Sequence, residues 1–238
     1  ALLATGDELV RPGEPAGPDQ ITASSLPAVA AIVARAGGEP IDLGIARDTL
    51  QSLNEAVDRA EQAGADILVT LGGASVGEHD LVQKALAGRG MDLGFWRVAL
   101  RPGKPLMHGR LGSMLMLGLP GNPVSSFVCA ILFLVPAVRA LSGDPAAADD
   151  PSEGAILAID VPENGPRQDY MRARMHPERK MEPGGPFGEL MTITPHEVQD
   201  SSMLGLLQAS EALLVRPPHA PEARAGEPCR VIVLSRFC

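Results

Sequence analysis

Aromatic side chains are scarce in this sequence, at 3% of 238 residues. Proteins that bind single-stranded nucleic acid stack bases on exposed aromatic rings, so this scarcity argues against such a platform. Acids outnumber bases to give a net charge of −9, which disfavours non-specific binding to nucleic acid or to an anionic membrane. We therefore expect neither a nucleic-acid partner nor a membrane partner.

Cysteine is rare as well. Cys129, Cys229 and Cys238 are odd in number and form no CxxC pair. The histidines show no spacing typical of metal ligands. No disulfide framework is predicted, which is typical of a reducing compartment, and we expect a cytoplasmic protein. No signal peptide opens the chain, which begins on an apolar A-L-L-A without methionine, as in a piece of a longer protein.

Charge is missing altogether from residues 111–138. A run of this length could indicate a membrane span, but Pro120-Gly121-Asn122-Pro123 interrupts it. We expect only about a dozen apolar helical residues after the interruption, too few to cross a bilayer. A buried core helix is the better interpretation.

The most informative stretch is A-D-I-L-V-T-L-G-G-A-S-V-G-E-H-D-L, at 65–81. Its apolar run 67–71 predicts a strand buried on both faces of a parallel sheet. Gly72 and Gly73 follow, where the missing Cβ permits a sharp turn or a close approach to a ligand. A strand, a glycine-rich turn and a helix from Leu81 form a common ligand-binding edge. The alternative is a tight loop in which Asp80 is only a helix N-cap.

Strands and helices alternate over residues 1–143. We expect strands at 1–5, 41–45, 67–71, 95–100 and 114–119, and helices at 21–36, 50–63, from 81, and at 124–141. This alternation predicts an α/β domain with a mostly parallel, doubly wound, three-layer sheet. The motifs G-D-E-L, R-D, G-G-A-S-V-G-E-H-D, R-P-G-K-P and L-P-G-N-P all follow strands. They should therefore converge on one edge of the sheet.

The composition changes after residue 143. Residues 144–154 are rich in Pro, Gly and Asp, as in a linker. Residues 155–238 contain short apolar or alternating runs separated by Pro- and Gly-rich turns. They predict a small, mostly β domain, with a helical turn at 203–209.

Carboxylates are absent between Asp92 and Asp144. The basic residues of this segment are Arg97, Arg101, Lys104, Arg110 and Arg139. Such a local excess of positive charge suits an anionic ligand. A buried segment that excludes acids would explain the gap, but not the presence of Arg101 and Lys104 around a Pro-Gly turn.

Together the motifs resemble those of the MoeA/gephyrin-E family, the molybdopterin molybdenumtransferases, over their C-terminal half. The matching motifs are T-G-D-E-L (5–9), L-G-I-A-R-D (43–48), G-G-A-S-V-G-E-H-D (72–80), F-W-R-V-A-L-R-P-G-K-P (95–105), L-P-G-N-P-V-S (119–125), R-Q-D-Y-M-R-A-R (167–174) and D-S-S-M-L-G-L-L-Q-A-S (200–210). The resemblance implies a MogA/MoaB-like, molybdopterin-binding α/β domain at 1–143, a linker at 144–154, and the family's small C-terminal β domain at 155–238.

The sequence departs from the family in three respects. The family's G-Q-I-x-D-x-N reads D-Q-I-T-A-S-S at 19–25, so an Asp and an Asn are absent. The first lysine of K-P-G-K-P is Arg101, which keeps the charge but not the compact ammonium. The family's N-terminal domains are missing. Because the resemblance implies a homodimer whose partner completes the cleft, we expect this piece alone to be poorly active.

The resemblance also implies a reaction, the Mg²⁺-dependent insertion of molybdate into adenylylated molybdopterin with release of AMP, in molybdenum cofactor biosynthesis. It implies that Glu8, Asp48 and Asp80 bind the metal and act in catalysis with Lys104, since carboxylates suit a hard cation and an ammonium neutralises phosphate or molybdate. The residues implied to bind the substrates are Thr5, Gly6, Asp7, Gly72, Gly73, Ser75, Gly77, Arg101, Gly103, Pro120, Gly121, Asn122 and Ser125.

Two alternatives stay open. A MogA-like adenylyltransferase would act on the same pterin but consume ATP; such an enzyme could also be a partner of this protein. A non-catalytic scaffold of the gephyrin-E type would bind a peptide and need no intact acidic site. The presence of Glu8, Asp48 and Asp80 argues against the scaffold.

Overall fold

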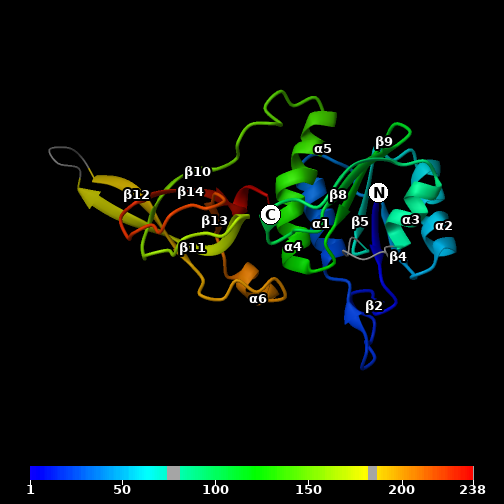
Figure 1. Cartoon of the computed structure of the whole chain (residues 1–238), viewed down its shortest axis with the longest axis horizontal. Coiled ribbons are helices and arrows are strands. Elements are labelled where there is room, and N and C mark those ends of the chain that lie inside the picture. The colour runs from blue at the N-terminus through cyan, green and yellow to red at the C-terminus, as the bar shows by residue number, and fades with distance from the viewer. Residues whose placement is uncertain (74–80, 182–186, 238) are drawn as a thin grey trace. The chain divides into compact units, whose positions relative to one another are not determined.

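The computed structural model of the chain (Figure 1) describes residues 1–73, 81–181 and 187–237, with the backbone alone for 178–181 and 187–190. Its contacts divide into two compact units. The first comprises Ala1–Val98 and Gly103–Ala148, and the second comprises Ala99–Pro102 and Asp149–Cys238. A short segment of the R-P-G-K-P region thus belongs with the C-terminal unit.

The first unit is built on a six-stranded sheet in the order β4-β1-β5-β9-β8-β6, beside a separate pair, β2 and β3. Its strands are β1 (Leu2–Thr5), β2 (Leu9–Val10), β3 (Ile21–Thr22), β4 (Asp42–Ala46), β5 (Ile67–Leu71), β6 (Asp92–Trp96), β8 (Met107–Leu111) and β9 (Met114–Leu119). Its helices are α1 (Ser25–Arg35), α2 (Leu50–Gln62), α3 (Leu81–Gly88), α4 (Pro123–Cys129) and α5 (Val135–Leu141).

This sheet is mostly parallel, as expected. Strands β4, β1, β5 and β9 run parallel, β8 is antiparallel to β9, and β6 is antiparallel to β8. Helices α1, α4 and α5 cover one face of the sheet, and α2 and α3 cover the other (Figure 1). The predicted three-layer α/β architecture is therefore confirmed, with β8 as its antiparallel strand.

The core of the unit forms around β5, whose residues are all buried. Leu68 packs in one cluster with Leu3 and Met116 of the flanking strands and with Leu53 and Leu86 of the covering helices. Burying one such side chain contributes about 1.5–3 kcal/mol. The central strand therefore fixes the positions of the strand ends on either side.

The helix after the Pro-Gly-Asn-Pro motif has the predicted bounds of 124–141 to within one residue. It runs without interruption from Pro123 to Leu141, 19 residues, which is long and apolar enough to cross a membrane by length and composition. The expectation that only about a dozen apolar helical residues follow the interruption was wrong. Pro136 does not interrupt the helix, because a π-helical turn over Ala130–Leu134 precedes it and accommodates its missing N–H. Val128, Ile131 and Leu134 are buried, so the helix belongs to the core.

Two other expectations were wrong locally. The predicted helix at 21–36 begins only at Ser25, because Ile21 and Thr22 pair with β2 instead. The predicted strand at 95–100 is divided into β6 and β7, because Arg97 adopts a φ of 92° and ends the extended run. In both cases a pairing partner distant in sequence decides the local structure.

The second unit is a small β barrel. Strands β12, β10, β14, β13 and β11 are neighbours in that order, and β12 also pairs with β11, so the ring closes. Its elements are β7 (Leu100–Arg101), β10 (Glu153–Leu157), β11 (Gln168–Met181), β12 (Phe187–Pro195), α6 (Leu204–Gln208), β13 (Ala212–Arg216) and β14 (Pro228–Val233). Strand β7 adds to the outside of the ring beside β11. Ala173, Ile193, Leu214 and Val231 fill the interior.

The barrel interior yields a stability prediction. Leu214 is fully buried (0% exposed) in this cluster, so Leu214→Ala should lower the free energy of unfolding by about 2–5 kcal/mol through lost burial and a cavity. Ile159 is 43% exposed on the same unit, and Ile159→Ala should cost within about 0.5 kcal/mol. Urea titrations followed by circular dichroism compare the two, and equal losses would contradict the assigned core.

Candidate functional site

The structure brings four of the predicted motifs to one edge of the sheet, called the carboxyl edge below and formed by residues 5–8, 46–48, 72–73 and 119–122. The Gly6 N–H donates to the Ala46 carbonyl at 3.3 Å, which joins the ends of β1 and β4. The Gly72 N–H donates to the Leu119 carbonyl at 3.1 Å, which joins the ends of β5 and β9. These are the carboxyl ends of parallel strands, where α/β folds bind ligands.

Glycine is required at the centre of this edge. Gly72 has a φ of +98°, and a Cβ there would lie 2.9 Å from the Thr5 carbonyl oxygen and 3.1 Å from Thr5 Oγ1. A Cβ on Gly121 would lie 3.3 Å from the Gly72 Cα, and one on Gly73 would overlap Val82. Three strand ends therefore pack backbone against backbone, so a ligand can approach their peptide groups closely.

Two buried polar atoms at this edge have no hydrogen-bond partner among the residues that the structure describes. One is Oγ1 of Thr5, a residue only 5% exposed, and the other is Oδ1 of Asn122. Leaving a buried polar atom unpaired costs about 1–3 kcal/mol. A ligand or ordered water at the carboxyl edge would satisfy both atoms, which fits the predicted roles of Thr5 and Asn122.

The acidic side of the edge lies at the ends of β1 and β4. The Asp48 N–H donates to Asp7 Oδ1 at 3.2 Å, and the Glu8 carboxylate lies over Gly6, where a Cβ would meet it at 2.5 Å. Burial raises the pKa of Asp48; a backbone hydrogen bond at Asp7 opposes the shift, and the charges of Asp7 and Glu8 add to it. A cation bound here would stabilise the charged form of Asp48.

The metal ligand set stays a prediction. Within residues 1–73, 81–181 and 187–237, no group of three His, Cys, Asp or Glu side chains has the geometry of a metal site. Glu8 and Asp48 lie near each other at the carboxyl edge. Asp80, together with Ser75 and Gly77, lies outside the described residues.

The Pro-Gly-Asn-Pro motif leads from β9 into the long helix. Pro123 occupies the first helical position, where its missing N–H costs nothing. The buried Ser126 hydroxyl donates to the Pro120 carbonyl, which fixes the turn, and Ser125 is 5% exposed in the first helical turn. The positive end of the helix dipole therefore lies at the carboxyl edge, where it favours an anion.

The R-P-G-K-P motif is shared between the two units. Lys104 belongs to the first; its carbonyl accepts from the Val98 and Leu106 N–H groups, each at 3.1 Å, and Gly103 is buried beside it. No carboxylate of the described residues lies within ion-pair distance of Lys104. Arg101 belongs to the second unit and forms an ion pair with Asp169, which raises the pKa of Arg101.

The structure adds residues that the sequence did not single out. A pocket of about 560 Å³ beside the acidic cluster is lined by Gly6, Asp7, Leu9, Gln20, Ile45, Arg47 and Thr49. Gln20 lies in the loop after β2 and lines this pocket. The sequence did not indicate it, because this loop contains none of the motifs predicted to follow a strand. Asp169 lies in the motif R-Q-D-Y-M-R-A-R, but no role was predicted for it, because no local pattern in the sequence pairs it with Arg101.

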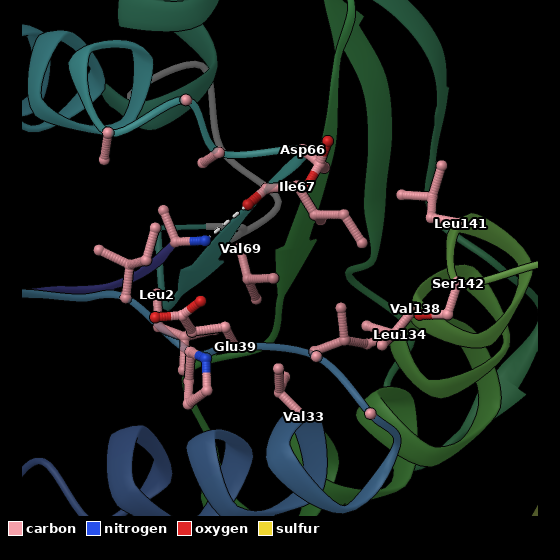
Figure 2. A pocket seen from close by; sticks show the side chains of 18 residues that line it. Leu2, Val33, Glu39, Asp66, Ile67, Val69, Leu134, Val138, Leu141 and Ser142 are labelled. Carbon is pink, nitrogen blue, oxygen red and sulfur yellow. Dashed lines mark hydrogen bonds between the residues drawn. The ribbon is translucent and has the colours of Figure 1, made fainter.

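A second pocket, of about 400 Å³, lies at the opposite edge of the first unit's sheet (Figure 2). The amino ends of β1 and β5 line it, together with the ends of α1, α2 and α5. Glu39 and Asp66 are its charged lining residues, and neither Lys nor Arg is among the residues that line it. Its charge is therefore wrong for an anionic ligand, and none of the predicted motifs reaches it.

The fold and site define a class. The α/β domain has glycine-packed strand ends, a helix N-terminus and clustered carboxylates at one edge, features typical of domains that bind phosphorylated ligands, and it is joined in sequence to a β barrel. Residues 1–140 match the family model for the "Probable molybdopterin binding domain", and residues 154–234 match the model for the MoeA C-terminal region (domain IV). The chain belongs to the MoeA family.

Curated relatives carry the name molybdopterin molybdenumtransferase. One from Nostoc sp. is 41% identical over 146 residues, covering 60% of this chain and 33% of the relative. One from Bacillus subtilis is 30% identical over 233 residues, covering 98% of this chain and 52% of the relative. The chain thus spans about half the length of these relatives, or less. The MoeA protein from Pyrococcus horikosii matches 98% of this chain and 53% of its own at a TM-score of 0.77 and 24% identity, which supports the fold.

The glycine contact can be tested directly. Gly72→Ala should destabilise the protein by about 3 kcal/mol, from an unfavourable φ and from the contact with the Thr5 backbone. Gly37 has a similar φ of +92° and open space around it, so Gly37→Ala should cost about 1 kcal/mol. Urea unfolding measures both, and an equal cost would show that the strand ends are not closely packed.

Proposed function

We propose that the chain is the substrate-binding part of a molybdopterin molybdenumtransferase, which inserts molybdate into adenylylated molybdopterin with release of AMP in molybdenum cofactor biosynthesis. The observation that supports this most is the carboxyl edge itself. It combines peptide groups open to close approach, a buried Thr5 hydroxyl without a partner in the described part of the chain, and the acids Glu8 and Asp48. An adenylate anhydride needs both features, donors for phosphate oxygens and a carboxylate-held cation.

The carboxylates suit Mg²⁺, a hard cation that prefers oxygen ligands. Glu8 and Asp48, with Asp80, would hold the ion, and it would neutralise phosphate charge and polarise the anhydride phosphorus. Asp7 has a different role, because its Oδ1 accepts from the Asp48 N–H and so orients the loop that presents Asp48.

The remaining groups bind and orient the anionic substrate. The Gly73 peptide N–H and the N–H groups at the start of the Pro123 helix donate to phosphate oxygens. Lys104 lacks a carboxylate partner among the described residues, so its ammonium is available to the charge that develops on the departing phosphate. Pro102, Pro105, Pro120 and Pro123 stiffen these loops and reduce the entropy lost on binding.

The adenylyltransferase alternative is weaker. It would use the α/β domain alone, whereas residues 154–234 match the C-terminal region of MoeA. A scaffold would not need carboxylates gathered at a sheet edge. For the whole protein we propose a cytoplasmic homodimer with magnesium as its cofactor, which accepts the adenylylated pterin from an adenylyltransferase.

The acidic cluster gives a prediction with an internal control. Asp48→Asn should lower Mg²⁺-dependent AMP release from adenylylated molybdopterin by about 100-fold, since it removes a metal ligand. Asp42 is exposed at the other end of β4 and pairs with Arg11, so Asp42→Asn makes the same charge change and should leave the rate within about twofold. Single-turnover assays with and without Mg²⁺ measure it. Undiminished Mg²⁺-dependent release from Asp48→Asn would refute the assigned metal site.

Lys104 gives a second prediction. Lys104→Ala should weaken AMP binding about five- to tenfold at low salt, because a charge-assisted contact is lost, and high salt should reduce the difference. Lys84 is exposed on α3. Lys84→Ala changes the net charge by the same amount and should leave AMP binding unchanged. Isothermal titration at two salt concentrations compares the variants. An unchanged affinity for Lys104→Ala would mean that the acid-free segment reflects burial alone.

A further inference from the structure

Arg101 is held in the barrel unit by a strand of its own. Ala99–Pro102 belongs to that unit, and Leu100 and Arg101 of β7 pair in parallel with Gln168 and Asp169 of β11. Leu100 is buried beneath this pairing, at 6% exposed. Because Arg101 and Asp169 are register partners, their side chains project from neighbouring strands on the same face.

The two charged groups differ sharply in exposure. An Arg101 Nη2 donates to Asp169 Oδ2; the Asp169 side chain is 4% exposed, whereas half of the Arg101 side chain is exposed. A buried carboxylate is tolerated only when it is paired, so Asp169 fixes the guanidinium at one end. No other described residue accepts a hydrogen bond from Arg101, so its outward N–H groups remain available.

We propose that Asp169 is a positioning residue that holds the Arg101 guanidinium as a receptor for a tetrahedral oxyanion, molybdate or the substrate's phosphate group. This inference rests on the proposed function, with Arg101 among the substrate-binding residues that the sequence resemblance implies. A planar guanidinium can give one nitrogen to a carboxylate and still present a fixed pair of N–H donors to an oxyanion. A lysine ammonium at this position would have no such fixed geometry, so the arginine of this motif and the buried aspartate act as a unit.

The competing interpretation is that Asp169 only neutralises Arg101 and fastens β7 to the barrel. The two interpretations predict opposite changes in anion affinity when the charge of Asp169 is removed. If Asp169 neutralises, then removing its charge frees a cation and strengthens anion binding. If Asp169 positions the Arg101 guanidinium, then removing the Asp169 charge makes the guanidinium mobile. Anion binding then weakens, because the side chain must be ordered on binding and loses entropy.

The test measures molybdate and inorganic phosphate binding to the full 238-residue chain by isothermal titration at low salt. Asp169→Asn keeps the shape and removes the charge; we expect about tenfold weaker molybdate binding, similar to Arg101→Ala. The double variant should be no weaker than either single variant, because the two residues act through one contact. As a control, Asp160→Asn breaks an exposed ion pair with Arg224 in the same unit and should leave the molybdate affinity unchanged.

The outcomes separate this inference from the function on which it rests. Wild-type protein that binds neither molybdate nor phosphate would overturn the proposed function and the inference together. Binding by the wild type with equal or tighter binding by Asp169→Asn would overturn the inference alone. If circular dichroism shows that Asp169→Asn does not fold, the Arg101→Lys variant replaces it in the test. Arg101→Lys keeps the positive charge but loses the paired N–H donors of the guanidinium, so a molybdate affinity equal to that of the wild type would overturn the positioning role.

Discussion

The contact of the Gly72 and Gly121 backbones beneath Thr5 is the constraint on which the carboxyl edge depends. The five-residue buried strand β5 fixes where its end lies, and the positive φ of Gly72 lets the chain leave it without a side chain between neighbours. A Cβ would separate these strand ends and push the Pro120 turn outward. The same close packing buries Thr5 Oγ1 with no partner within residues 1–73, 81–181 and 187–237, so a polar atom is available there to a ligand.

Chemistry at this edge is divided by position along the sheet. Acids follow β1 and β4, with the pKa of Asp48 raised by burial and by its acidic neighbours. Glycine peptides and the start of the Pro123 helix follow β5 and β9, where they favour an anion. An anhydride bound along the edge would meet cation-holding groups on one side and phosphate donors on the other. Because parallel strands place successive loops side by side, the spatial division repeats the order of strands in the sheet and not the order in sequence.

The sequence predicted those elements whose own pattern determines them. Strand β5 was predicted with its observed bounds because it is apolar throughout. Strand β8 was not predicted: Met107–Leu111 includes Gly109 and Arg110, and it is a strand because it pairs with β9 through a turn at Gly112. The strand-end motifs could likewise be placed on one edge from their positions alone. The pairing of Arg101 with Asp169 could not, because 68 residues separate them and only the pairing of β7 with β11 brings them together.

Charge counting along the sequence overstates the positive field of the acid-free segment, and the structure shows why. Arg139 pairs with Asp144 at 2.7 Å, Arg97 stacks over the Trp96 ring, and Arg101 is bound to Asp169. Arg110 lies across from Asp92 and Leu115, the residues at the amino ends of β6 and β9, so it is at the edge opposite the site. Lys104 precedes Met107, which pairs with Gly118 near the end of β9, so it lies toward the carboxyl edge without a counter-charge among the described residues. Arg97 follows Trp96, which pairs with Met107, so it lies at the same end of the sheet, with its guanidinium over the Trp96 ring. Of the five basic residues in this segment, Lys104 therefore provides the one ammonium near the carboxyl edge. Arg101 of the same motif is instead bound to the buried Asp169. The two cations of R-P-G-K-P are therefore not interchangeable: the position of Lys104 depends on the sheet, and that of Arg101 depends on the barrel.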